Sequence, residues 1–168
     1  MAKNLFSTIW TVEGLYGRLI LCVGLLVVVL DQISKLMVEK MFSLGEQLPV
    51  VDGFFDLTLT YNKGVAFGMF ASLDQVPRVI ALAGAISLAL LVVAYLLLKE
   101  YRRDPIGQVF LAMIVGGAIG NIIDRVRVGA VVDFLDFYYG SFHWPAFNIA
   151  DSAICAGVFL LLFRKAPA

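Results

Sequence analysis

The sequence predicts a mainly α-helical integral membrane protein with four transmembrane helices and a small extracytoplasmic β-sheet between the first and second helices. Of its 168 residues, 61% are hydrophobic and 15% are charged, which is far more apolar than a soluble globular protein. Four apolar runs approach the length of about 20 residues that crosses a bilayer. A fifth stretch alternates apolar and polar residues, as half-buried strands do. Little sequence is left over, so we expect residues 1–168 to form one membrane-embedded domain.

The first span is expected at about residues 18–38. Its apolar run, Leu19 to Leu30, is short for a crossing, so the helix must continue through Asp31 and Lys35. Asp31 then lies near one membrane face. No small-residue cleavage site follows the run, which indicates an uncleaved span rather than a signal peptide.

The connection over residues 41–76 is expected to hold the outer sheet. The stretch Asp56-Leu-Thr-Leu-Thr-Tyr61 alternates as a strand does, and Val50-Val51 followed by Asp52-Gly53 indicates a preceding strand and turn. The segment Asn62-Lys-Gly-Val-Ala-Phe-Gly68 comes next. Its glycines permit tight turns near a ligand or another segment, although a hairpin turn with apolar anchors explains the same residues.

Three further spans are expected at about residues 78–98, 106–124 and 147–164. The span at 78–98 contains a run of 20 residues without a charge, and the apolar run of the span at 147–164 is interrupted only by Asn148 and Asp151. Gly116 and Gly120 lie four residues apart in the third span, a spacing that lets two helices approach closely.

The placement of lysine and arginine in the short flanks of the spans predicts that both termini are cytoplasmic. Seven basic residues fall on the side of the termini and six on the other side, where they lie among acidic residues in presumed functional loops. The seven are Lys3, Arg18, Lys99, Arg102, Arg103, Arg164 and Lys165.

Acidic and amide side chains interrupt the apolar stretches near the ends of the third and fourth spans. Such groups are costly at membrane depth and usually face a protein interior or a water pocket, so they indicate a functional site. Structural explanations remain open: Asp124 can pair with Arg125 or Arg127, and Asp151 can stabilise the positive end of a helix. The residues are Asn121, Asp124, Asp133, Asp136, Asn148 and Asp151.

Two carboxyl groups brought together at a membrane boundary cannot easily both ionise, so they share a proton. One member can then deprotonate a water while the other protonates an oxyanion or a leaving amine, as direct peptide hydrolysis requires. The lone His143 has no obvious nucleophile beside it, and no Cys, His or Glu cluster forms a metal site, so neither a metal nor a cofactor is expected. Spacing alone leaves Asp124, Asp133 and Asp136 as candidates to face Asp151.

Five motifs follow one another along the chain: Asp31-Gln-Ile-Ser-Lys35, Asn62-Lys-Gly-Val-Ala-Phe-Gly68, Gly116-Gly-Ala-Ile-Gly-Asn-Ile-Ile-Asp-Arg125, Gly129-Ala-Val-Val-Asp-Phe134 and Trp144-Pro-Ala-Phe-Asn-Ile-Ala-Asp151. In this order they resemble the motifs of the lipoprotein signal peptidase, or signal peptidase II, family. The resemblance covers nearly the whole chain from the first span to the fourth. It implies an aspartic protease of the bacterial cytoplasmic membrane that cleaves a prolipoprotein just before its diacylglyceryl-modified cysteine.

The resemblance also implies roles for single residues. The catalytic aspartates of the family fall on Asp133 and Asp151, with Asp124 as a supporting residue and the second candidate for the pair. Asp31 is similar to a structural acid, which Lys35 can meet one helical turn later, and Gly64 is a further supporting position. Positions that line the substrate site in the family match Asn62, Asn121, Arg125 and Asn148.

The partners implied are diacylglyceryl-prolipoprotein substrates and membrane lipids, and we expect a monomer with its active site near the outer face. The equal numbers of basic and acidic residues, 13 of each, argue against nucleic acid. Two other functions also explain buried acids and amides: a small ion or proton carrier, and an assembly subunit whose acids only pair helices. The carrier has no need for an ordered outer sheet and loop.

Overall fold

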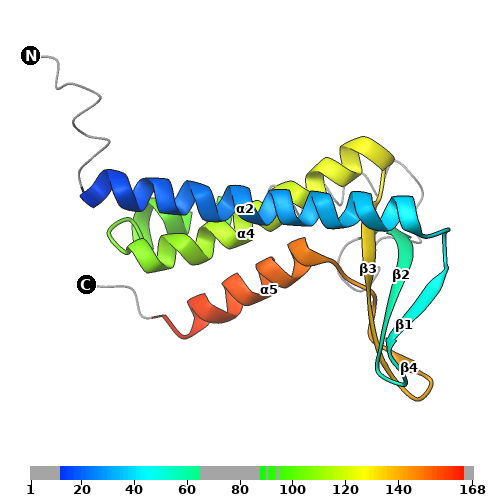
Figure 1. Ribbon diagram of the computed structural model, residues 1–168. Coiled ribbons are helices and arrows are strands. Elements are labelled where there is room, and N and C mark those ends of the chain that lie inside the picture. Colours follow the sequence, from blue (N-terminus) through cyan, green and yellow to red (C-terminus); the bar gives the residue numbers. More distant parts are fainter. Residues whose placement is uncertain (1–11, 65–87, 90, 94, 165–168) are drawn as a thin grey trace, which may run out of the picture.

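Helices packed side by side and a small sheet across one end of them make up the fold (Figure 1). The computed structural model describes residues 12–64, 88–89, 91–93 and 95–164. The helices whose bounds are defined in this part of the chain are α2 (Val12–Met41), α4 (Pro105–Val128) and α5 (Ile149–Leu162), with one π-helical turn, η2 (Leu96–Glu100). Residues 88–89, 91–93 and 95 are also helical. The strands are β1 (Gln47–Val51), β2 (Phe55–Asn62), β3 (Val131–Tyr139) and β4 (Phe142–His143).

Two of the helices match expected spans. The stretches Gly17–Met41 and Pro105–Val128 are long and apolar enough to cross a membrane, in line with the spans expected at 18–38 and 106–124. The fourth expected span, 147–164, contains α5, which is shorter because Asn148 caps its first turn and the helix ends at Leu162. The second, 78–98, lies largely outside the described residues. Within the described residues, two helices are long and apolar enough to cross a membrane, so the expected number of four spans is not established there.

Glycine residues let the three helices approach closely. A Cβ atom at Gly116 would lie 2.6 Å from the carbonyl oxygen of Gly24, and one at Gly117 would collide with the carbonyl oxygen of Ala150. Glycine therefore permits backbone-to-backbone contact of α4 with α2 on one side and with α5 on the other. This packing brings polar groups of all three helices to one place.

At the end opposite the sheet, an ion pair joins the beginning of α4 to the end of α5. Asp104 caps α4 by accepting from the backbone N–H of Ile106, and Arg164 donates to both of its carboxylate oxygens over 2.7 Å. Hydrogen bonds from the Arg164 guanidinium hold the pKa of Asp104 below its usual value. The pair sets how far α5 extends along α4.

The sheet has the strand order β1-β2-β3-β4, and all neighbours are antiparallel. The strand expected at 56–61 is confirmed as β2, and Val50 and Val51 lie in β1. The expected position of the sheet, between the first and second helices, is wrong in part. Strands β3 and β4 come from the connection between α4 and α5, where Val131–Tyr139 is rich in β-branched and aromatic residues.

A small apolar cluster holds the sheet against the end of α2. Val38 of α2 packs with Leu59 of β2 and with Val132 and Phe134 of β3, all of which are buried. Because Val132 and Phe134 flank Asp133 in sequence, the same packing fixes the position of that acid over the helix ends.

Candidate active site

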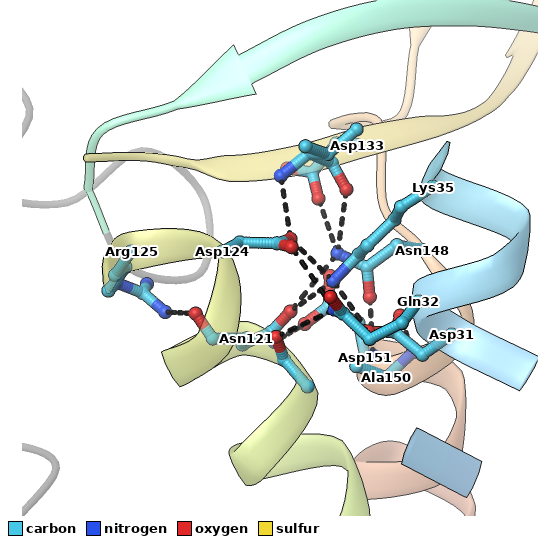
Figure 2. A network of polar contacts seen from close by, with 12 residues as sticks. Asp31, Gln32, Lys35, Asn121, Asp124, Arg125, Asp133, Asn148, Ala150 and Asp151 are labelled. Carbon is cyan, nitrogen blue, oxygen red and sulfur yellow. Dashed lines mark hydrogen bonds and ion pairs between the residues drawn. The ribbon is translucent and has the colours of Figure 1, made fainter. Parts of the chain in front are cut away.

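The polar side chains expected from the sequence meet where α2 and α4 end, α5 begins and β3 crosses them (Figure 2). Helix α2 supplies Asp31, Gln32 and Lys35, and α4 supplies Asn121, Asp124 and Arg125. Strand β3 supplies Asp133. Asn148 and Asp151 come from the cap and the first turn of α5. Residues separated by more than a hundred positions thus form one cluster.

Asp133 is almost completely buried, with 2% of its surface exposed. Its Oδ1 atom accepts from Asn148 Nδ2 over 2.7 Å, and its Oδ2 atom accepts from Asn62 Nδ2 over 3.2 Å. Burial, and then the neighbouring Asp151 carboxylate, raise the pKa of Asp133 to about 7. A carboxyl group of this kind can hold a proton at neutral pH and donate it.

Asp151 lies in the first turn of α5 and is half-buried. Its Oδ1 atom accepts from Asn121 Nδ2 over 2.8 Å, and its backbone N–H donates to Asn148 Oδ1 over 2.9 Å. Asp151 is more exposed than Asp133 and lies at the N-terminal end of a helix rather than in a strand. Asp133 and Asp151 therefore have different surroundings, which is the condition for an acid and a base to act side by side.

Two amide side chains connect these acids. Asn148 Nδ2 donates to Asp133 over 2.7 Å and lies 3.3 Å from Asn121 Oδ1, while Asn121 donates to Asp151. Asn148 is fully buried, and its amide also lies 3.2 Å from the carbonyl oxygen of Val132. The amide of Asn148 is hydrogen-bonded to protein groups on all sides, an arrangement suited to holding Asp133 and the first turn of α5 in place.

Lys35 lies fully buried beside Asp133 and Asp151 (Figure 2). Its Nζ atom is 2.8 Å from Asp31, 2.7 Å from Asp124 and 3.0 Å from Asn121 Oδ1. The pairing expected between Asp31 and Lys35 is confirmed. All three donors of the ammonium group find an acceptor, as a buried charge requires.

Asp31 and Asp124, the two carboxylates bound to Lys35, also accept hydrogen bonds from backbone N–H groups next to Asp151 and Asp133. Asp31 Oδ1 accepts from the N–H of Ala150 over 2.9 Å, one residue before Asp151. Asp124 Oδ2 accepts from the N–H of Val132 over 3.1 Å, one residue before Asp133. Asp124 thus contacts both the Lys35 ammonium group and the backbone of β3 beside Asp133.

Asp136, which spacing left open as a partner for Asp151, is turned away from it. It lies three residues after Asp133 in β3, and side chains three apart point to opposite faces of a strand. Its carboxylate contacts His143 Nδ1 at 2.9 and 3.0 Å. The structure therefore groups Asp133, and not Asp136, with Asp151.

Asn62 and Arg125 join the loop that follows β2 to the cluster. Asn62 Oδ1 accepts from the N–H of Gly64 over 2.9 Å, while Arg125 donates to the carbonyl oxygen of Gly64 over 3.0 Å and to that of Asn121 over 3.2 Å. The remainder of that motif, through Gly68, lies outside the described residues.

Gln32 is a member of the site that the sequence analysis did not single out. Its Nε2 atom lies 3.1 Å from Asp124 Oδ1, 3.1 Å from the carbonyl oxygen of Gly120 and 3.2 Å from Asp31 Oδ2. The sequence signal that could have identified Gln32 is its position next to Asp31 inside an otherwise apolar helix. A Cβ atom at Gly120 would collide with the Asp31 carboxylate, so the lack of a side chain there makes room for the network.

An apolar cavity of about 150 Å³ reaches the cluster from the helices. Its polar end is formed by Asn121 and Arg125. The other lining residues are Ala89, Val93, Ile114, Val115, Ala118, Ile122 and Ile154. A cavity of this kind suits an apolar segment whose polar backbone ends at the acids.

Comparisons with known proteins give consistent matches. The family model described as signal peptidase (SPase) II matches residues 23–166. The chain is 47% identical over 149 residues to a lipoprotein signal peptidase of Syntrophotalea carbinolica, covering 88% of this chain and 91% of that one. It is 41% identical over 146 residues to a lipoprotein signal peptidase of Geobacter sulfurreducens, covering 83% and 90%. A bacterial membrane enzyme solved at 2.3 Å by the in meso method has a TM-score of 0.73 and 32% identity, covering 87% and 85%.

Proposed function

The chain belongs to the signal peptidase II family, and we propose that it cleaves the signal peptide of diacylglyceryl-modified prolipoproteins immediately before the lipidated cysteine, with Asp133 and Asp151 as its catalytic carboxyl groups. As a member of the family it is a protease that processes lipoproteins, and an integral protein of the bacterial inner membrane. The single observation that carries the proposed chemistry is the chain of amides from Asp133 through Asn148 and Asn121 to Asp151.

In the proposed reaction Asp133 begins protonated and Asp151 begins ionised. Asp151 removes a proton from water, whose oxygen attacks the scissile carbonyl carbon, and Asp133 gives its proton to the carbonyl oxygen. Asp151 then passes its proton to the leaving nitrogen as the C–N bond breaks, and a hydroxyl proton of the intermediate returns to Asp133. Each acid ends as it began, and no covalent intermediate with the protein is required.

The assignment of acid and base is supported by the surroundings of the two side chains. The pKa of Asp133 is raised to about 7 by burial and by the nearby Asp151 carboxylate, so a large fraction of Asp133 is protonated near neutral pH. Asp151 accepts a hydrogen bond from Asn121 and lies in the first turn of α5, a position different from that of Asp133 in β3. Arg125 of α4 and Asn62 of β2, both of which bind Gly64, would hold an extended substrate backbone, and Asn121 would contribute at the end of the apolar cavity.

The membrane arrangement is also part of the proposal. Residues 78–98 would form the second of four spans, with both termini in the cytoplasm and the acids near the outer face, where water is available. The signal helix of the substrate would pack sideways against the apolar cavity, and its diacylglyceryl chains would stay in the lipid. The functional unit would be a monomer, because the acids come from one chain.

Mass spectrometry of a synthetic diacylated precursor peptide incubated with the purified protein tests the function. We expect one new product that begins with the lipidated cysteine and one that ends at the residue before it. Their summed mass should equal that of the precursor plus one water. The same peptide without the diacylglyceryl group is the control and should remain uncleaved. Cleavage elsewhere, or none, would overturn the proposal.

A further inference from the structure

We propose that His143 is a positioning residue for the catalytic pair, acting through its contact with Asp136 on the face of β3 opposite to Asp133. The inference rests on the proposed function. His143 lies in β4, at the tip of the connection that leads back to α5, and its side chain is 46% exposed. It is not part of the polar cluster described above.

Both catalytic acids belong to one folded-back segment of chain. β3 carries Asp133 on the outgoing arm, and the returning arm carries Asn148, which binds Asp133 over 2.7 Å. Between the tip and the site, the N–H of Trp144 donates to the carbonyl oxygen of Phe137 over 2.8 Å. Closer to the site, Leu135 and Phe147 exchange hydrogen bonds of 2.8 and 3.1 Å. The separation of the two arms therefore sets where Asn148 meets Asp133.

The backbone alone holds the tip of this segment weakly. β4 has two residues, paired as Tyr138 with His143 and Tyr139 with Phe142. Pro145 follows in the returning arm and has no N–H to donate. A short two-stranded ribbon of this kind is marginally stable without side-chain contacts.

His143 supplies such a contact between the arms. Its Nδ1 atom lies 2.9 and 3.0 Å from the two carboxylate oxygens of Asp136. Its ring stacks on that of Tyr138 with centroids 4.9 Å apart. The Tyr138 hydroxyl in turn accepts from the N–H of Gly53 over 3.1 Å, in the turn between β1 and β2. The imidazole thus ties the returning arm to β3 and, through Tyr138, to the first hairpin.

The charges around Asp136 make this contact important. Asp136 and Asp56 are directly opposite each other in β3 and β2, and each has 6% of its surface exposed. Like charges at such a position are destabilising. Among the described residues, Asp56 Oδ1 has no hydrogen-bond partner. An N–H donor at position 143 therefore compensates a buried acid that would otherwise push the strands and arms apart.

Steady-state kinetics on the diacylated precursor, with three variants, test the inference. His143→Asn keeps an N–H at the position of Nδ1, whereas His143→Leu has a similar size and no donor. We expect His143→Leu to lower kcat by about tenfold, the scale of one lost hydrogen bond to a charged group, with KM within about twofold. His143→Asn should restore most of kcat. Tyr139→Ala, which removes an 85% exposed side chain at the same tip, should behave as the wild type.

A double variant, Asp136→Asn with His143→Leu, covers the case in which the single Leu variant does not fold. It leaves no unpaired charge at position 136 and still lacks the contact, so its kcat should remain low. Wild-type kcat in either Leu-containing variant, equal kcat in the Asn and Leu variants, an effect confined to KM, or an equal loss in Tyr139→Ala would each overturn the inference. Failure of the wild-type protein to cleave the precursor would instead overturn the proposed function.

Discussion

Asp31 and Asp124 lie on two sides of the Lys35 ammonium group, at 2.8 and 2.7 Å, and each binds the backbone N–H that precedes one of the two acids proposed as catalytic. One buried cation is thus joined to the backbone of α5 beside Asp151 and to the backbone of β3 beside Asp133. The network around Lys35 therefore holds the backbone beside both Asp133 and Asp151.

Removing either catalytic carboxyl group should abolish cleavage. We expect Asp133→Asn and Asp151→Asn each to lower kcat by about a thousandfold or more, because an amide can neither give a proton to the carbonyl oxygen, as Asp133 does, nor take one from water, as Asp151 does. Both variants should still insert in membranes. The measurement is product formation from the diacylated precursor by mass spectrometry. Asp52→Asn, at an exposed turn outside the network, is the matched control, and normal cleavage by either catalytic variant would refute the assignment.

Activity should depend on pH with a bell-shaped profile. Burial raises the pKa of Asp133 to about 7, so kcat/KM should fall as pH rises through about 7, where the proton needed by the carbonyl oxygen is lost. It should also fall at acidic pH, where the second carboxyl group becomes protonated and can no longer activate water. The two apparent pKa values belong to the pair rather than to single residues. A flat profile from pH 4 to 9, with chemistry limiting, would contradict the shared proton.

Lys35→Met should unfold or strongly destabilise the protein. The change leaves Asp31 and Asp124 buried without a counter-charge, and breaking a buried ion pair from one side costs about 3–5 kcal/mol. Thermal unfolding in detergent measures the effect. Lys40→Met, at an exposed position one to two turns later in the same helix, should leave the midpoint nearly unchanged. Equal midpoints for the two variants would show that the buried ammonium group contributes little.

Gly120→Ala should impair both stability and activity. A Cβ atom there would collide with the Asp31 carboxylate, so either the helices separate or Asp31 releases the N–H of Ala150. Overpacking of this kind costs about 1–3 kcal/mol. Gly17→Ala is the control, because nothing lies within 4 Å of a Cβ atom at that helical position. The unfolding midpoint and kcat of Gly120→Ala should both be clearly lower than those of Gly17→Ala. Wild-type values for Gly120→Ala would mean that the helices have room to adjust.

Much of the site could be predicted, because its residues are unusual in their surroundings. A carboxylate or an amide in an apolar helix is costly whatever the fold, so Asp124, Asn148 and Asp151 stood out in the sequence. The pairing of Asp31 with Lys35 followed from the period of one helix. The role of Gln32 could not be predicted in the same way, because a single amide beside an acid has no distinctive spacing.

The sequence by itself determined that the chain is apolar enough for a membrane, that β2 alternates as a strand, and which polar residues are costly enough to need a site. Only the tertiary structure decided that β3 crosses the helix ends and joins the sheet, since its aromatic residues are equally typical of a membrane interface. It also shows that Asp133 rather than Asp136 joins Asp151, as the motif resemblance implies. Alternation along β3 puts the two acids on opposite faces, but which face lies toward Asn148 and the start of α5 depends on contacts between segments distant in the chain, which no local pattern specifies.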